Sequence, residues 1–435
     1  MYKYNAIAHI EESYGFKGVI QFVKMVRAPY VVGESYAYSG EVESYYNVLN
    51  ILLEDPSESI INFAKGFFQY YTSMSGINNV ISILKSIDIH NYKDIIKIPL
   101  TVMSCAHNEM WTFIETLPDT IKNEYWENIQ IGFFNKEESF FLIRKMIEYK
   151  RFDVALDIVY NSLREKLILP TSIIEETIIG FLTNIKEEAT VHQYYEMAQV
   201  VYELDRMVDV NFQALLAIEL GSYRILEMYG NINETKFVKE IMSNPESMMD
   251  IIDMVYLSSE EKEQLKEIED MNNHESYATQ CFHILSSLRA TPFVDSNNMI
   301  DEKALNNYIE RLLELGNAKN KIDGVNDAIG GLLGNYPEID NYPPMPLCDI
   351  IEKHNNRNMI SGFKTRIYNK RGVTVRPAFE GGILEEIEAS KYKKYADKVR
   401  FTHPIVCRIF DDLSNEYKQM AKEENNRVEI EKMEF

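Results

Sequence analysis

The chain has 435 residues, of which 46% are hydrophobic, 67 are acidic and 45 are basic, so its formal net charge is −22. The composition is that of a folded protein, and the length favours two or three subdomains or one elongated helical array over a single compact core. The acidic excess disfavours a nucleic-acid-coating role and docking on anionic membranes, because both require cations that neutralise phosphate.

The cysteine and hydropathy patterns favour a cytoplasmic protein. The four cysteines, Cys105, Cys281, Cys348 and Cys407, are far apart and form no CxxC pair, which is typical of reduced, intracellular cysteines. The N-terminus has no apolar signal core, and no apolar run reaches the roughly 18 residues that a membrane-spanning helix needs.

The first 134 residues are predicted to form a helical subdomain. Helical patterns cover 16–23 and 42–53, and Pro56 opens the next helix, since proline is tolerated in a first turn. Both tryptophans, Trp111 and Trp126, lie close together in the sequence. We expect this aromatic pair to lock the packing of two helices rather than to form a binding cage.

The helical pattern is clearest from Asn135 onward. Asn135 followed by Glu138 is a helix-start signature, because the Asn side chain can accept a free N–H and the acid lies in the positive first turn. One apolar face carries Phe140, Ile143 and Ile147. After a polar break at 149–151, a second face carries Phe152, Ala155, Leu156, Val159 and Leu163. Two such helices joined by a short turn lie antiparallel, and stacking of these hairpins is the organisation of helical-repeat proteins.

Further helices follow in order at 171–184, 191–204, 209–228, 233–243 and 245–256. The pattern at 209–228 is apolar on nearly every side and predicts one buried central helix. The acidic run 258–270 favours a solvated helix face or a linker helix, with an acidic docking tail as the alternative. Turn residues at 291–298 mark the start of a C-terminal module. Its helices are predicted at 302–316, 321–333, 346–355, 380–398 and 402–424.

No period-2 alternation extends beyond about five residues, so no strand is predicted. The predicted fold is all-α: stacked antiparallel helical hairpins, a HEAT/TPR-like superhelix, with a helical C-terminal module. The predicted regions are an N-terminal helical subdomain at 1–134, a central helical-repeat region at 135–290 and the C-terminal module at 291–435, which contains a basic turn at 364–382.

The charge of the chain reverses at 353–379, where no Asp or Glu occurs. A glycine pair follows, directly before the helical pattern that begins at Ile383. Free N–H groups at a helix start beside arginine can hold a phosphate or a carboxylate. The candidate partner- or anion-binding residues are Lys364, Arg366, Asn369, Lys370, Arg371, Gly372, Arg376, Gly381 and Gly382.

Three interpretations of this basic segment stay open. The cations neutralise the chain's own acidic surface and cap neighbouring helices, or they dock a partner, or they form a nucleotide or nucleic-acid site. The first is favoured over the second. The third is the weakest, because neither GxxxxGK[ST] nor GxGxxG is present.

No catalytic residue, metal site or cofactor is predicted elsewhere. His274, Cys281 and His283 lie close in the sequence, but their spacing matches no common zinc arrangement. His192 and Glu196 are four residues apart on one helix and are expected to form a surface hydrogen bond. GxSxG and cysteine-nucleophile contexts are missing from the sequence.

A set of landmark residues extends over most of the chain: Trp111, Leu117-Pro118, Tyr125-Trp126, Arg151, Ala155-Leu156, Ala217 to Leu220, Tyr223, Ile300-Asp301, Asp327 to Gly330, Asn369, Arg371 to Val373, Gly381-Gly382, Glu385, Ala389 and Tyr392. This set resembles the C-terminal helical array of a family of large, uncharacterised bacterial proteins. In similar proteins the array stands behind other domains, and the resemblance implies a link to anti-phage defence systems. The chain departs from the pattern at Glu386, where arginine is expected. It also begins at the array with no effector domain ahead of it, so the resemblance implies that a separate polypeptide supplies any activity.

Together these features favour a non-catalytic protein-interaction scaffold, sensor or regulatory subunit of a bacterial, anti-phage-type complex. The expected partner is another protein, such as a separately encoded effector enzyme, and a homo-oligomer is also open. The alternative function is an enzyme, or a nucleotide or anion sensor, with a site near the turn at 364–382. Neither nucleic acid nor a membrane is expected as a partner.

Overall fold

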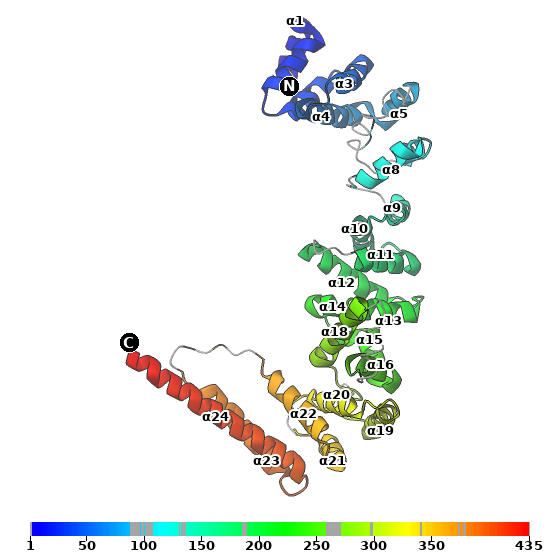
Figure 1. Cartoon of the computed structure of the whole chain (residues 1–435). Helices are drawn as coiled ribbons and strands as arrows, with labels where there is room; N and C mark the ends of the chain where they lie inside the picture. Colours follow the sequence, from blue (N-terminus) through cyan, green and yellow to red (C-terminus); the bar gives the residue numbers. More distant parts are fainter. Residues whose placement is uncertain are drawn as a thin grey trace. The chain divides into compact units, whose positions relative to one another are not determined.

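The elements of the computed structural model in Figure 1 are helices. It describes residues 2–87, 96, 100, 108–129, 131, 136–184, 189–257, 271–295, 299–339, 342–372, 375, 377 and 380–434. Within these ranges the only β-type pairing is an isolated antiparallel bridge between Val294 and Ile300. The predicted all-α fold of stacked helical hairpins is confirmed. Among the described helices, none combines the length and the apolar character needed to cross a membrane.

The chain divides into two compact units, Met1–Ile218 and Glu219–Phe435. The division falls within α13 (Phe212–Gly221), and not at either of the predicted limits, after residues 134 and 290. The three-region organisation stays a prediction.

The described helices of the first unit, before α13, are α1 (Tyr2–Met25), α2 (Pro29–Ala37), α3 (Val42–Glu54), α4 (Glu58–Ser75), α5 (Ile77–Ser86), α7 (Asn108–Ile114), α8 (Asp119–Asn128), α9 (Lys136–Glu148), α10 (Phe152–Arg164), α11 (Thr171–Asn184) and α12 (Val191–Arg206). Near the N-terminus the backbones of α2 and α4 are in contact. A Cβ atom on Gly33 of α2 would lie only 1.9 Å from the carbonyl oxygen of Phe63 in α4. Beside this contact, Tyr36 packs against Phe63 and Phe67 with ring centroids 5.9 and 5.7 Å away.

The two tryptophans join α7, α8 and α9. Trp111 and Trp126 are buried with ring centroids 6.3 Å apart, and Trp111 stacks on Phe141 of α9 at 5.3 Å. The indole N–H of Trp126 donates to Glu115 at 3.0 Å, which satisfies the polar end of the ring. The prediction that this aromatic pair locks helix packing is confirmed.

Helices α9 and α10 form the predicted hairpin, with Lys150 at φ 56° in the turn. The buried face of α9 carries Leu142, Ile143 and Met146, whereas Phe140 is 45% exposed. The predicted apolar face of α9 therefore coincides with the buried face at Ile143 and differs from it at Phe140. Asn135, the expected cap of α9, lies outside the described residues.

Arg151 connects this hairpin to the helix before it. Its Nη1 donates to the carbonyl oxygens of Trp126 and Ile129 at 3.0 and 2.7 Å. These two carbonyls lie at the end of α8, where the helix itself supplies no N–H partners. Arg151 therefore caps the end of α8 from the start of α10.

The second unit begins with a broken helix. Beyond α13 it contains α14 (Tyr223–Tyr229), a 3-10 turn (Ile232–Glu234), α15 (Lys236–Ser243), α16 (Pro245–Val255), α18 (Met271–Ser287), α19 (Glu302–Ala318), α20 (Ile322–Gly334), α21 (Met345–His354), α22 (Arg357–Lys370), α23 (Ile383–Val399) and α24 (Pro404–Glu434). The prediction of one continuous helix over 209–228 is wrong, because Ser222 leaves the helical conformation with φ −103° and ψ 7°. Glu219, on the α13 side of the break, is buried and accepts the backbone N–H of Phe237 in α15 at 2.6 Å. The acidic run 258–270 lies outside the described residues.

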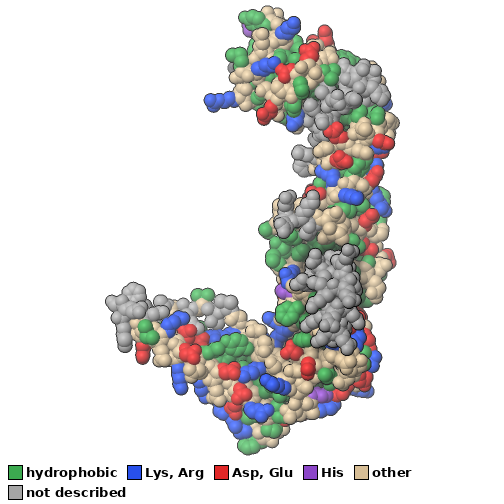
Figure 2. Space-filling model, viewed as in Figure 1, with side chains coloured by type: hydrophobic (Ala, Val, Ile, Leu, Met, Phe, Trp, Pro, Cys, Tyr) green, Lys and Arg blue, Asp and Glu red, His purple; other side chains and the backbone are tan. Residues whose placement is uncertain are grey.

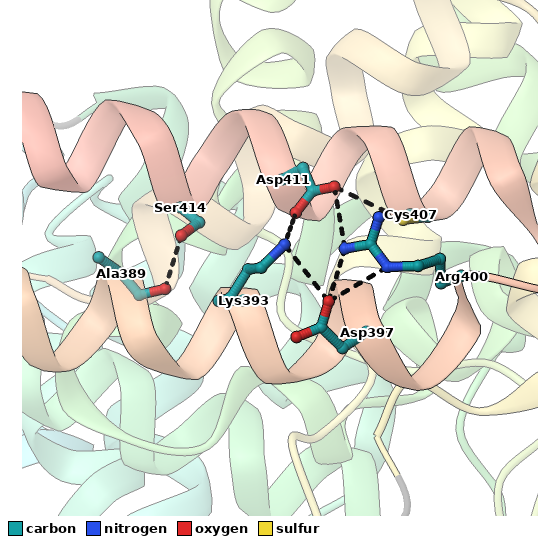
Figure 3. A network of polar contacts seen from close by, with 7 residues as sticks. All are labelled: Ala389, Lys393, Asp397, Arg400, Cys407, Asp411 and Ser414. Atoms are coloured by element: carbon teal, nitrogen blue, oxygen red, sulfur yellow. Dashed lines mark hydrogen bonds and ion pairs between the residues drawn. The ribbon is translucent and has the colours of Figure 1, made fainter.

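Helices α23 and α24 lie side by side, as Figure 1 shows. Figure 3 shows the polar contacts between them. Ser414 donates to the carbonyl oxygen of Ala389 at 2.8 Å, and Lys393 lies 2.9 Å from Asp411. Arg400 bonds Asp397 at 2.5 Å and lies 3.5 Å from Asp411, so the charges alternate along the seam. The predicted helices at 380–398 and 402–424 are confirmed as the core of this pair.

Candidate functional site

The basic segment, predicted as a turn at 364–382, instead begins as a helix, α22 (Arg357–Lys370), so that prediction is wrong for residues 364–370. Asn355 takes the left-handed conformation, φ 41°, and ends α21. The side chain of Asn356 then accepts the backbone N–H groups of Asn358 and Met359 at 2.8 and 3.2 Å. Asparagine is suited to both positions, because it tolerates positive φ and its side chain caps helix starts.

Glycines bring α22 against α20. A Cβ atom on Gly330 would lie 2.0 Å from the carbonyl oxygen of Met359, and one on Gly362 would lie 2.2 Å from that of Asp327. No side chain fits in either place, so the two backbones are in contact. This close packing fixes where the polar side chains of α22 lie relative to α18 and α20.

The structure distributes the predicted candidates over one helix end and the next helix start. Lys364, Arg366, Asn369 and Lys370 lie on α22, Arg371 is its C-cap, and Gly372 follows at φ 66°. Gly381 and Gly382 stand directly before α23. Arg376 lies outside the described residues, and so its place in the site stays a prediction.

Arg366 is buried, with 7% of its surface exposed. Its Nη1 and Nη2 donate to the carbonyl oxygens of Ser286 and Leu285 at 2.7 and 2.6 Å. These carbonyls end α18, so Arg366 caps that helix as Arg151 caps α8. Burial lowers the pKa of Arg366 to about 10.

Lys370 turns its ammonium group inward as well. Its Nζ donates to the carbonyl oxygen of Tyr336 at 2.5 Å and lies 5.8 Å from the ring centre of Tyr342. Burial lowers the pKa of Lys370 to about 8, although the carboxylate of Glu338 opposes this shift.

Arg371 joins the end of α22 to the first turn of α23. Its Nη2 donates to Glu385 at 2.8 Å, and its guanidinium group lies 5.4 Å from the ring centre of Tyr417 in α24. Burial acts to lower the pKa of Arg371, but the bond to Glu385 outweighs it, so the pKa is raised. The pair also complements both helix dipoles, because the cation lies at a C-terminus and the acid at an N-terminus.

The glycine pair packs α23 against α24. Asn425 accepts the backbone N–H of Gly382 at 2.9 Å, and a Cβ atom on Gly382 would lie 2.3 Å from the carbonyl oxygen of Ala421. Gly381 has φ 68°, and its Cβ would clash with the Asn425 side chain. The Gly382 N–H, which the sequence suggested for an anion, is thus bonded to α24.

These contacts match the interpretation in which the cations cap helices and pair with the chain's own acids. Lys364 fits it too, since its Nζ lies 2.5 Å from Glu416 of α24. Docking of a partner at the basic segment stays a prediction. We therefore look for a docking site on the surface next to these bonded cations.

That surface contains a pocket of about 310 Å3 between the end of α22 and α23. It is lined by Glu338, Lys370, Arg371, Leu384, Ile387, Glu388, Lys391 and Tyr392. On the outer side of α23, Ile383 and Ile387 are 51% and 56% exposed, one helical turn apart. Lys391, a further turn on, lies 3.2 Å from Glu338 and 2.5 Å from Glu388. We call Ile383, Ile387, Lys391 and Lys370 the α23 surface.

Sequence reasoning named Lys370 and missed the other three residues of the α23 surface. A signal was present, since Ile383 and Ile387 share one helical face while the helix buries Ala389, Tyr392 and Ala396 against its neighbours. Periodicity alone could not tell which of the two apolar faces is covered, because that depends on α24.

The other sequence candidates are ordinary structural contacts where they are described. His192 lies 3.1 Å from Glu196, the expected pair four residues apart. Cys281 is a buried free thiol, and His283 lies 2.8 Å from Glu227, whereas nothing is described of the His274 side chain. Among the described residues no group of three or more His, Cys, Asp or Glu side chains could hold a metal ion.

Comparison with known proteins adds no identity to this geometry. The chain matches no protein-family model, no curated protein and no solved structure.

Proposed function

We propose that the chain is a non-catalytic helical scaffold or regulatory subunit that docks another protein through the α23 surface. The observation that carries this proposal is the pair of exposed isoleucines, Ile383 and Ile387, beside a lysine that has no carboxylate partner among the described residues, Lys370. Exposed apolar side chains rimmed by polar ones are typical of protein interaction sites. Figure 2 shows acidic, basic and apolar side chains interspersed over α23 and α24.

The chemistry of the α23 surface favours an amphipathic helix as the docked element. Ile383 and Ile387 are spaced to receive apolar side chains at i and i+4 of a partner helix. A carboxylate on the polar edge of that helix would reach the inward-turned ammonium group of Lys370 through the pocket that this lysine lines. The pKa of Lys370 is about 8, and a carboxylate of the partner beside it would raise this pKa. Formation of the complex near pH 8 should therefore be accompanied by proton uptake at Lys370.

The biological setting is part of the proposal and rests on the resemblance to bacterial helical arrays linked to anti-phage systems. The docked partner would then be a separately encoded effector enzyme, and this chain would position or restrain it. A helical array that binds a partner through one face is a common architecture for such a subunit.

The test is co-purification of the tagged full-length chain from its native host, with neighbouring genes intact, read by mass spectrometry. We expect one stoichiometric partner that carries an enzymatic domain. The double variant Ile383→Asp, Ile387→Asp should lose it with unchanged circular dichroism. The matched control is Ile168→Asp, at a 99% exposed position between α10 and α11, which should retain the partner.

Substitutions of the buried cations are unsuitable for this test. A carboxylate at position 366 would face the carbonyls of α18, and one at position 371 would face Glu385, so either would unfold the unit locally. Retention of the partner by the double isoleucine variant, or recovery of the chain alone, would refute docking at the α23 surface.

A further inference from the structure

A second cavity, of about 200 Å3, lies among α16, α18, α20 and α22 and shares no lining residue with the pocket at the α23 surface. Its lining is mainly apolar, with Phe282, Leu285 and Leu332 among the contributors. Tyr256, Asp327 and Arg366 supply polar groups. This volume is below the range of drug-sized sites, roughly 300 Å3 and more, so it suits a small molecule.

Arg366 is the unusual group in this cavity. Among the described residues no carboxylate lies within ion-pair distance of it, and its two hydrogen bonds go to the backbone carbonyls of Leu285 and Ser286. A buried cation normally requires a charged partner, and a helix C-terminus offers only about half an elementary charge. The guanidinium also has more N–H groups than these two bonds use.

Gly331 leaves the space beside those remaining N–H groups open. A Cβ atom on Gly331 would lie 3.5 Å from Nη2 and 3.8 Å from Nε of Arg366, at ordinary contact distance. Because glycine has no Cβ, this place belongs to the cavity, which Gly331 lines. Nε and Nη2 are the two donors that a carboxylate can accept side by side.

The carboxylate of Asp327 favours anions of low charge in this cavity. The hydroxyl of Tyr256 donates to its carboxylate at 3.1 Å, and burial raises the pKa of Tyr256 to about 12, so the hydroxyl stays a donor. The negative charge of Asp327 would repel a dianion such as a phosphate monoester more than a monoanion.

We propose that this cavity binds a small organic monocarboxylate. Its oxygens accept hydrogen bonds from Nε and Nη2 of Arg366, and its apolar body lies against Phe282 and Leu332. The two sites share no side chain, but Arg366 and Lys370 lie one helical turn apart on α22 and repel each other electrostatically.

Phenylacetate is a suitable probe, with phenylacetamide as its neutral counterpart of the same shape and phenyl phosphate as the dianion. Titration of the full chain, followed by calorimetry or ligand-detected NMR, should give a Kd of about 1 mM or tighter for phenylacetate. The amide and the phosphate should each bind at least about tenfold more weakly, because one lacks the charge and the other meets Asp327.

Two variants separate a binding role from a structural one. Gly331→Ala places a methyl group beside Nε and Nη2 without disturbing the fold, and should weaken phenylacetate at least about tenfold while the melting temperature stays level or rises. Asp327→Asn keeps an acceptor for Tyr256, removes the negative charge, and should tighten binding.

Three results would overturn the proposal: no binding of phenylacetate, equal binding of the amide, or equal binding by the Gly331→Ala variant. Tighter binding of phenyl phosphate than of phenylacetate would assign the site to a different class of anion. Each of these binding measurements uses the intact chain and does not require its protein partner to be known.

Discussion

Arginines perform the same task in both units. Arg151 bonds two carbonyls at the end of α8, and Arg366 bonds two at the end of α18. The guanidinium bridges two carbonyls that a helix leaves without partners, through both terminal nitrogens in Arg366 and through Nη1 alone in Arg151. A cation at such a position is part of the packing between successive hairpins, which explains why much of the basic segment points inward.

Lys370 gives a pH-dependent prediction at the residue scale. Its pKa is about 8 in the folded chain, against an ordinary value of 10.5. Between these values the unfolded chain holds a proton on Lys370 that the folded chain does not, so the folded state gains stability as pH rises through this window. The free energy of unfolding of the native chain relative to Lys370→Met should therefore increase from pH 8 to 10.5 and stay level below pH 8.

Urea unfolding at closely spaced pH values measures this difference. Lys394→Met, which removes an exposed lysine of α23, controls for the loss of one positive charge. A difference that stays flat across the whole window would mean that Lys370 titrates normally and that its ammonium group is solvated.

At the scale of the element, the packing of α20 against α22 depends on which glycine faces the neighbour. Gly330 and Gly331 are adjacent in sequence, but the first meets the backbone at Met359 and the second faces the cavity beside Arg366. The same chemical change should therefore have opposite effects at the two positions.

Gly330→Ala should destabilise the second unit by about 3 kcal/mol, because a backbone carbonyl 2.0 Å away cannot move without separating the helices. Gly331→Ala should stabilise it by about 1 kcal/mol, since alanine favours the helix and its methyl group has room. Chemical denaturation of the two variants side by side tests the pair. Equal effects would show that α20 and α22 do not touch as the structure has them.

At the scale of the whole molecule, the chain divides into two compact units, and we expect a destabilising substitution in one unit to leave the other folded. Both tryptophans of the chain, Trp111 and Trp126, lie buried in the first unit. Tryptophan fluorescence thus reports on the first unit, whereas circular dichroism reports on all helices.

Gly330→Ala should shift part of the circular dichroism transition to lower urea and leave the fluorescence midpoint unchanged. The mirror variant is Gly66→Ala in α4, whose Cβ would lie 2.1 Å from the carbonyl oxygen of Tyr30, and it should shift the fluorescence transition. Coincident shifts of both signals in either variant would indicate one cooperative unit, since two-state behaviour makes all probes agree.

The sequence by itself determined the architecture. Amphipathic periodicity is a local property, so the α9–α10 hairpin, the α11 range and most helices of the second unit could be predicted from neighbouring residues. The break at Ser222 was not predicted from the periodicity, and the basic segment that contains α22 was predicted to be a turn. At 209–228 the apolar pattern continues without interruption across the break, and in the basic segment the charge is uniform. Neither local pattern shows where contacts with distant residues change the backbone conformation.

Only the tertiary structure decided what the basic segment does. Arg366 meets Ser286 and Leu285 from another helix, and Gly382 meets Asn425 from another again. From the sequence, helix capping was favoured for these cations, but docking of a partner and binding of an anion stayed open, and the Gly382 N–H was suggested for an anion. Whether a cation is exposed, caps a helix or faces a cavity depends on residues that are distant in the sequence. Local composition does not show which distant residues will contact it in the fold.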